Sequence, residues 1–243
     1  MIALPPNTTL LPDAEATARA AADHLVAIAE TAASERIAIC LSGGSTPKRL
    51  YELLASEAYV DRLPWSRLHW FFGDDRVVPW DDPLSNVRMV REAFGHGAAL
   101  PPTHFHFIAS DEGAEIGARA YQRTLQQYYG AETLDPARPL FDLVLLGLGS
   151  DGHTASLFPG KPAVEETKAW VAPVPEAGME PFVPRITLTF PAIASSRSVL
   201  FLVNGAGKRD PLSRLAAGED LPSGRARSEG HLEWFIDKAA ADA

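Results

Sequence analysis

Asp151 and His153 are the residues whose types and spacing best suit acid–base chemistry in this sequence. They lie in the segment GSDGH at 149–153, which follows the apolar run FDLVLL at 141–146. A continuous apolar run bounded by glycines predicts a strand buried on both faces, as in a parallel sheet. Ligands of such sheets bind just beyond the carboxyl ends of the strands. Histidine is the side chain best suited to acid–base work near neutral pH, so we expect His153 to do chemistry there, with Asp151 close enough to influence its orientation or charge.

A glycine-rich turn between a predicted strand and a predicted helix is a second candidate site. Backbone N–H groups and the helix dipole make such a turn an anion site without any positive side chain. The turn is neither a P-loop nor a GxGxxG motif, and an ordinary tight turn with a serine or threonine N-cap has the same composition. Its residues are Ser42, Gly43, Gly44, Ser45 and Thr46.

A third candidate is the segment Asp74-Asp75-Arg76, which directly follows a predicted strand at 68–72. Arginine is the preferred side chain for a two-pronged contact with phosphate or carboxylate. The same composition also fits a solvated loop with a local ion pair, which contributes little.

The net charge of −9 argues against nonspecific binding to nucleic acid, which needs a basic face. An acidic protein would also repel an anionic ligand, so a site for one must be locally positive. Besides Arg76, the candidate cations are Arg185, which opens a predicted strand, and Lys208, which follows a glycine-flanked turn.

Other kinds of site lack support in the sequence. No HxxxH, HExxH or CxxC spacing occurs, so we expect no zinc or iron site. No GxSxG elbow indicates a serine hydrolase, and we expect the reaction to proceed without a metal or an organic cofactor. The single cysteine, Cys40, lies in an apolar run and is expected to be buried. No long apolar segment or signal sequence is present, which predicts a cytoplasmic protein without a membrane span. The other histidines do not lie in glycine-bounded loops like the one that holds His153; they are His24, His69, His96, His104, His106 and His231.

Strand and helix patterns alternate through most of the chain, which predicts a mostly parallel sheet with helices on both faces. Helical patterns cover 13–34, 46–54, 86–94 and 112–129, and strand patterns cover 37–41, 68–72, 104–108, 141–147, 170–174, 185–190 and 199–203. The proline-rich segment 159–184 is expected to be an irregular excursion close to the site. With 243 residues and no repeat or long linker, residues 1–243 are expected to form one domain.

The segment GLGSDGHTASLFPG at 147–160 resembles the signature of the 6-phosphogluconolactonases. Further motifs match that family in the expected order: LSGGSTP at 41–47, FGDDRVVP at 72–79 with Ser85-Asn86, RITLT at 185–189, and FLVNG at 201–205 with Lys208. Two positions depart from the family pattern, Asp75 where glutamate is usual and Leu84 where aspartate is usual.

The resemblance implies a single-domain, Rossmann-like three-layer α/β/α sandwich and the hydrolysis of 6-phosphoglucono-δ-lactone to 6-phosphogluconate. It implies that His153 is the base, oriented by Asp151 or Asp74, and that backbone N–H groups or Arg76 stabilise the oxyanion. Ser42 to Thr46, Arg185 and Lys208 would bind the phosphate. The expected partner is the small sugar phosphate, with no nucleic acid or membrane, and the expected state is a monomer or small homo-oligomer.

Two rival functions share the expected fold. The first is a glucosamine-6-phosphate deaminase, in which a glutamate follows the histidine; here the stretch 154–160 (TASLFPG) contains no acid. The second is a non-catalytic sugar-phosphate sensor, which usually carries a DNA-binding helix-turn-helix ahead of the sensor. Asp74 and His153 fit an enzyme better than a sensor.

Overall fold

The computed structural model describes residues 3–95, 102–109 and 111–241. Its strands are β1 (Thr8–Leu11), β2 (Ile37–Leu41), β3 (Leu68–Phe72), β4 (Asp74–Arg76), β5 (Leu143–Gly147), β6 (Val171–Val174), β7 (Arg185–Leu188), β8 (Ser198–Val203) and β9 (His231–Asp237). Its α-helices are α1 (Ala14–Thr31), α2 (Ser45–Leu54), α3 (Asn86–Phe94), α4 (Ala114–Tyr129), α5 (Phe190–Ala194), α6 (Arg209–Ala216), α7 (Pro222–Arg225) and α8 (Lys238–Ala241). Short 3₁₀ turns are η1 (Val60–Arg62), η2 (Pro102–His104), η3 (Pro162–Glu165) and η4 (Ala206–Lys208).

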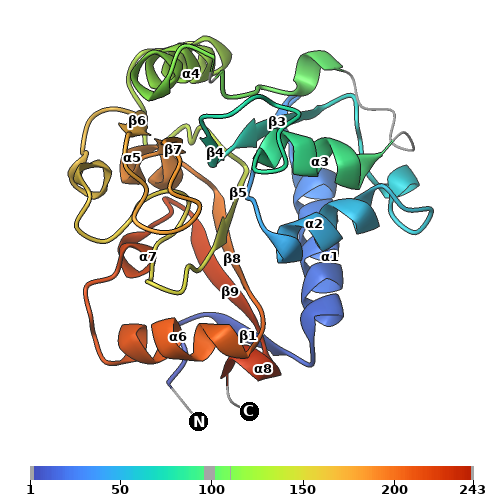
Figure 1. Ribbon diagram of the computed structural model, residues 1–243. Coiled ribbons are helices and arrows are strands. Elements are labelled where there is room, and N and C mark those ends of the chain that lie inside the picture. The colour runs from blue at the N-terminus through green and yellow to red at the C-terminus, as the bar shows by residue number, and fades with distance from the viewer. Residues whose placement is uncertain (1–2, 96–101, 110, 242–243) are drawn as a thin grey trace.

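A six-stranded sheet in the order β1-β9-β8-β5-β2-β3 forms the centre of the molecule, and all its pairings are parallel. Helices α1, α2 and α3 lie together on one side of it, and the small sheet β4-β7-β6 lies with α5 and α7 on the other (Figure 1). The alternating pattern predicts this parallel sheet covered on both faces, and the resemblance implies the three-layer α/β/α arrangement that the structure has. The antiparallel pairing of the small sheet is an addition that the pattern did not indicate.

Burial explains why the central strands form where they do. All five residues of β2 and all six of β8 are buried, as expected for strands covered by helices on both faces. Cys40 is among them, so it is a small apolar core residue, and its burial raises the pKa of the thiol well above the usual range.

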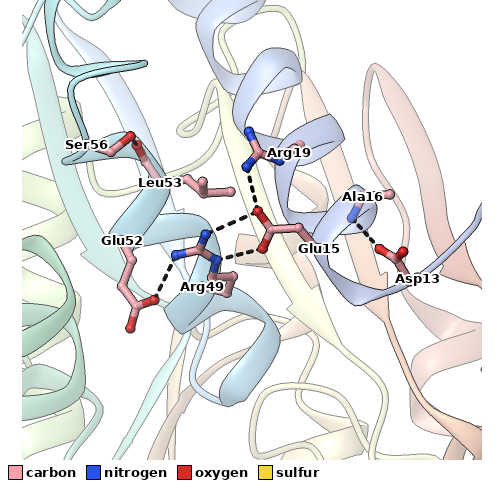
Figure 2. Close-up of polar contacts among 8 residues, drawn as sticks. All are labelled: Asp13, Glu15, Ala16, Arg19, Arg49, Glu52, Leu53 and Ser56. Atoms are coloured by element: carbon pink, nitrogen blue, oxygen red, sulfur yellow. Dashed lines mark hydrogen bonds and ion pairs between the residues drawn. The ribbon is translucent and has the colours of Figure 1, made fainter.

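Helices α1 and α2 pack side by side, and polar contacts join their exposed edges (Figure 2). Asp13 begins α1 by accepting a hydrogen bond from the backbone N–H of Ala16 at 2.8 Å. Arg49 of α2 holds Glu15 of α1 with two hydrogen bonds of 2.7 and 3.1 Å, and Arg19 reaches the same carboxylate at 2.9 Å. These contacts lie at the surface between α1 and α2, and the first residues of α2 belong to the glycine-rich turn.

One predicted strand is wrong. Residues 104–108 do not form a strand, because η2 occupies the start and a single bridge joins Phe105 to Trp70 of β3. Only the N–H of His106 continues the pairing, at 2.9 Å from the carbonyl of Trp70. The aromatic side chains that suggested a strand instead stack on β3, with the His106 and Phe71 rings 4.2 Å apart.

Residues 74–76, which the sequence predicts to be a loop, form β4, and no sequence pattern indicates β1 or β9. Segment 159–184 carries η3 and β6 between irregular stretches. No helix among residues 3–95, 102–109 and 111–241 is long and apolar enough to cross a bilayer. His96 lies outside the described residues.

Candidate active site

Four adjacent strands, β8, β5, β2 and β3, end at the same edge of the large sheet. The chain moves outward from β2 to β3 in one direction and from β5 to β8 in the other, so β2 and β5 flank the point where the strand order reverses. Loops at such a point form the usual ligand site of an open α/β sheet. The four segments singled out in the sequence follow these strands, at 42–46, 74–76, 149–153 and 204–208.

A cavity of about 300 Å³ opens between these loops. It is lined by Ser42, Gly43, Gly44, Ser45, Thr46, Asp74, Arg76, His153, Arg185 and Lys208, together with residues that include Asn86, Ser150, Met179 and Asn204. Apart from Asp151, which touches His153, every residue predicted to bind or act on a ligand therefore faces one cavity.

His153 and Asp151 form a close pair at the carboxyl end of β5. The Nδ1 atom of His153 lies 2.5 Å from Oδ1 of Asp151, and the backbone N–H of His153 donates to the same oxygen at 3.0 Å. Burial opposes ionisation of Asp151, but its hydrogen bonds with His153 outweigh this effect and lower the pKa of the carboxyl. Because Asp151 engages Nδ1, Nε2 is the nitrogen left to act on a ligand.

Glycines make room for the His153 side chain. A Cβ atom at Gly149 would lie 2.0 Å from Nδ1 of His153, so no other residue fits there without displacing the ring. Gly152 has φ +89°, a left-handed conformation that glycine adopts without strain. The ring of Phe158 packs 4.6 Å from the imidazole. The DGH turn therefore presents the histidine in one fixed place.

Asp74, the other candidate partner of His153, has different neighbours. Its Oδ2 accepts a hydrogen bond from Ser156 at 2.5 Å, and its backbone carbonyl accepts one from Nδ2 of Asn86 at 2.9 Å. Ser156 is fully buried and its backbone N–H donates to Thr187 of β7 at 3.1 Å. Ser156 thus connects the loop after β5 with the small sheet and holds the Asp74 carboxylate at the edge of the cavity.

Asp75 shapes the neighbouring loop rather than the cavity. Its buried carboxylate accepts hydrogen bonds from the backbone N–H groups of Asn86 at 2.7 Å and Arg76 at 2.8 Å, and from the Ser85 hydroxyl at 3.2 Å. Burial raises the pKa of Asp75 to about 6 despite these donors. Asn86 is thereby fixed against Gly43, where an added Cβ would meet its Oδ1 at 2.2 Å.

The glycine-rich turn delivers the N-terminus of α2 to the cavity. Gly44 is the N-cap with φ +109°, and no side chain caps the helix. The first N–H groups of α2 are therefore available to an anion. Nδ2 of Asn204, at the end of β8, donates to Oγ1 of Thr46 at 3.2 Å and ties the two loops together. The sequence assigned no role to Asn204 or Ser156, although both lie in the motifs quoted above, because their hydrogen-bond partners lie far away in the chain.

Lys208 completes this part of the cavity from η4. Its ammonium group has no hydrogen-bond or ion-pair partner among the residues that the structure describes. Burial lowers its pKa, and the charge of Asp151 opposes that shift. A half-buried lysine without an anionic partner is suited to a ligand that brings one.

None of the other histidines that the structure describes lines the cavity. His69, His104 and His106 stack beside β3, with Nδ1 of His69 lying 3.1 Å from Nε2 of His106. Within the described ranges, no group of three or more histidine, cysteine and acidic side chains is arranged to hold a metal ion.

Comparison with known proteins relates this site to a family. Residues 12–234 match the family described as glucosamine-6-phosphate isomerases/6-phosphogluconolactonase. The 6-phosphogluconolactonase of Nostoc is 37% identical, with 95% of each chain covered, and that of Synechocystis is 40% identical over 84% of this chain and 83% of its own.

Solved structures agree with this relationship. The 6-phosphogluconolactonase of Thermotoga maritima has a TM-score of 0.81 at 30% identity, covering 95% of this chain and 99% of its own. The enzyme of Trypanosoma brucei has a TM-score of 0.78 at 31% identity, covering 99% of each. A monomeric glucosamine-6-phosphate deaminase has a TM-score of 0.80 at 19% identity, covering 97% of this chain and 99% of its own, and it shares the fold. The chain belongs to the glucosamine-6-phosphate isomerase/6-phosphogluconolactonase family.

Proposed function

We propose that this protein hydrolyses 6-phosphoglucono-δ-lactone to 6-phosphogluconate, a step of the oxidative pentose phosphate pathway. The observation that carries the proposal is the Asp151–His153 pair beside a cavity that Lys208 and the α2 N-terminus make locally positive. Relatives named 6-phosphogluconolactonase, matched over nearly their whole length, support the same reaction.

The base in this mechanism is Nε2 of His153. It takes a proton from a water molecule while the water oxygen attacks C1 of the lactone. The C1–ring oxygen bond then breaks, and the imidazolium returns its proton to the ring oxygen, which leaves as the C5 hydroxyl. The resulting carboxylic acid ionises and releases one proton. A positioned base of this kind contributes about 10²–10⁴-fold to the rate.

Asp151 acts through His153. Its carboxylate holds Nδ1 and stabilises the imidazolium that forms during the attack, in the manner of a base–orienter pair. Asp74 lines the cavity from β4, and its carboxylate accepts a hydrogen bond from Ser156 and not from His153. We assign the orienting role to Asp151 and the Asp74 carboxylate to a polar contact with the sugar.

The phosphate site consists of the first N–H groups of α2 together with Lys208 and Arg185, which line the same cavity. Helix N-termini bind phosphate because their unpaired N–H groups and the helix dipole favour negative charge. Asn204 holds Thr46 next to η4, which brings the turn and Lys208 to one region of the cavity. A locally positive site of this kind offsets the repulsion that an anionic substrate meets from a protein with a net charge of −9.

The deaminase and the sensor remain less favoured. The stretch after His153 offers hydroxyl and apolar side chains and no acid, whereas the deaminase needs a glutamate there. A sensor would not require an oriented histidine base. We also propose that the enzyme is a single-domain cytoplasmic protein acting as a monomer or small homo-oligomer. One hydrophobic core that runs through both sheets supports this domain assignment.

A coupled assay tests the proposal. Freshly generated 6-phosphogluconolactone is supplied, 6-phosphogluconate is followed through its dehydrogenase, and spontaneous hydrolysis is subtracted. We expect a rate far above the spontaneous one and no ammonia from glucosamine 6-phosphate. A rate equal to the background would refute the lactonase, and ammonia release would establish the deaminase instead.

A further inference from the structure

A second cavity, of about 510 Å³, lies at the β1–β9 edge of the large sheet. Residues 3–7, the start of β9, the end of α6 and helix α7 with the segment that follows it form its walls. Among the described residues, none lines both this cavity and the one around His153. Its volume is typical of small-molecule sites, which measure about 300–1,000 Å³. We call it the edge cavity.

The wall formed by residues 3–7 is held firmly against β9. Asn7 has φ 57°, a left-handed conformation that is uncommon for a residue other than glycine. Its side chain donates to the carbonyl of Leu232 at 3.1 Å, and its own carbonyl accepts from the backbone N–H of Trp234 at 3.1 Å. The wall is therefore in place before any ligand binds.

Most of the lining is apolar. It comes from Leu4, Pro5, Leu215, Ala226, Leu232 and Trp234. Trp234 is only 4% exposed, and its ring stacks on that of Phe201 with the centres 3.8 Å apart, so the indole is rigid. An apolar wall that contains a fixed aromatic ring favours a ligand with a flat apolar ring of its own.

Ser223 brings an unpartnered hydroxyl to this lining. The residue is 1% exposed, and its Oγ is buried without a hydrogen-bond partner among the residues that the structure describes. Its backbone N–H donates to the carbonyl of Gly152 at 3.0 Å, which fixes the residue in place. A buried hydroxyl without a partner is unfavourable, and rotation about one bond can aim it at an acceptor on a ligand.

Arg227 is the one charged residue in the described lining of the edge cavity. Its Nη1 donates to the backbone carbonyls of Gly224 at 2.8 Å and Ala226 at 2.7 Å, and no carboxylate in the described part of the chain pairs with it. Neutral acceptors fix the direction of the guanidinium group but leave its charge without a counter-ion. The cavity therefore favours a ligand that carries one negative charge, and a planar carboxylate matches the guanidinium fork.

We propose that the edge cavity binds a small monocarboxylate with a flat apolar ring. The ring lies against the apolar wall that contains Trp234, and Arg227 and the Ser223 hydroxyl bind the carboxylate. A sugar phosphate does not fit this lining, because the apolar wall would leave its hydroxyl groups without partners. The site is independent of the proposed function, since it shares no described residue with the cavity around His153.

Two ligands that differ in one group test this site. Naphthaleneacetate carries a carboxylate, and naphthaleneethanol carries a neutral hydroxymethyl group on the same ring system. Dissociation constants are measured by calorimetry with the full chain. We expect the parent to bind naphthaleneacetate with a Kd of about 1 mM or below, as ligands of this size reach, and to prefer it about tenfold over the alcohol.

Three variants and their controls locate the ligand. Ala216→Trp places a large ring in the cavity and should abolish binding of both ligands, whereas Ala217→Trp, at the next exposed position and outside the lining, should not. Arg227→Gln should remove the preference for the carboxylate and leave the affinity for the alcohol unchanged. The control Arg62→Gln, at an exposed arginine in an ion pair, should change neither. Lys208→Ala should bind both ligands as the parent does.

Ser223→Ala separates a ligand contact from a structural role. Because its hydroxyl bonds to no described residue in the free protein, its removal should leave the melting temperature unchanged. The affinity for naphthaleneacetate should fall about 2–10-fold, the range of one hydrogen bond. A lower melting temperature with unchanged affinity would make Ser223 purely structural and remove it from the site.

The edge cavity is overturned as a carboxylate site if the parent binds neither ligand or binds both equally, or if Ala216→Trp binds them as the parent does. Loss of naphthaleneacetate binding in Lys208→Ala would place the ligand in the cavity around His153 instead. Sedimentation of the parent and of both tryptophan variants covers a further outcome. A parent dimer that only Ala216→Trp dissociates would assign this face to a second copy of the chain and refute the small-molecule site.

Discussion

Single residues define the chemistry of this site through contacts that leave little freedom. His153 is held by Asp151 on one side, by the backbone of Gly149 along its ring and by Phe158 nearby. A base held in this way meets its substrate without rearrangement, which is how positioning lowers a reaction barrier.

Replacing Gly149 with alanine tests this positioning. The new Cβ would overlap Nδ1 of His153, so the imidazole must move and its contact with Asp151 must change. Because a misplacement of about 1 Å can cost about 100-fold in rate, we expect kcat to fall by that order in a folded protein. Gly207→Ala is the matched control, since a Cβ there meets nothing within 4 Å. Equal kcat values for both variants would show that the histidine position is not critical.

Lys208→Ala tests the phosphate site by steady-state kinetics. Removing the ammonium group should raise KM for the phosphorylated lactone by at least about tenfold, because a charge-assisted contact is lost. The variant should also discriminate poorly between the phosphorylated lactone and glucono-δ-lactone, and inorganic phosphate should inhibit it less than the parent. Lys168→Ala, which removes an exposed lysine, serves as the control. If Lys208→Ala keeps the parent's preference for the phosphorylated lactone, the phosphate binds elsewhere.

At the scale of elements, the site depends on where strands end and helices begin. Buried tyrosine hydroxyls fix two of these strand ends. The Tyr51 hydroxyl accepts a hydrogen bond from the N–H of Ser42 and donates one to its carbonyl, and the Tyr121 hydroxyl does the same with Phe72. Helix α2 then carries the phosphate site, and its buried residues Leu50 and Leu54 anchor it in the core.

The exposed contacts between α1 and α2 should matter much less than this core packing. Arg49→Ala removes the bidentate pair with Glu15 and the contact with Glu52 (Figure 2). Surface ion pairs contribute little, so we expect the melting temperature to fall by no more than about 2–4 °C, with KM unchanged. Calorimetry and the lactonase assay check both values. A large rise in KM would mean that Arg49 is required to place the α2 N-terminus.

Much of this arrangement could be predicted from the sequence. Apolar runs such as 37–41 and 141–146 mark strands buried on both faces, and the turns that follow them identify the site. Strands β1 and β4 gave no such signal, because TTLL and DDR are short and not uniformly apolar. The contact between Ser156 and Asp74 could not be predicted either, since it joins segments 82 positions apart.

At the scale of the whole molecule, stability should fall in mild acid. Burial, followed by the charges of nearby histidines and of Arg36, lowers the pKa of both His69 and His106 to about 4. The unfolded chain, in which histidine has a pKa of about 6.5, binds more protons between these values. Stability therefore decreases as the pH falls from about 6.5 to 4. Asp75, whose pKa in the folded protein is raised to about 6, makes the folded state more stable as the pH falls, but it is one group against two histidines.

His106→Phe should reduce this acid sensitivity. The new ring can keep the stack on Phe71 without a titrating group. Urea unfolding at pH 7 and pH 5 should show a smaller loss of stability in the variant than in the parent, and the exposed control His231→Gln should behave like the parent. An unchanged pH dependence in His106→Phe would place the acid sensitivity in other groups.

Steady-state kinetics of His153→Ala with 6-phosphogluconolactone test most directly whether His153 is the base of a lactonase. We expect kcat, corrected for spontaneous hydrolysis, to fall by about 10²–10⁴-fold, while the affinity for glucitol 6-phosphate, which has no lactone to hydrolyse, stays close to that of the parent. A folded His153→Ala protein with a kcat close to that of the parent would show that His153 is not the base.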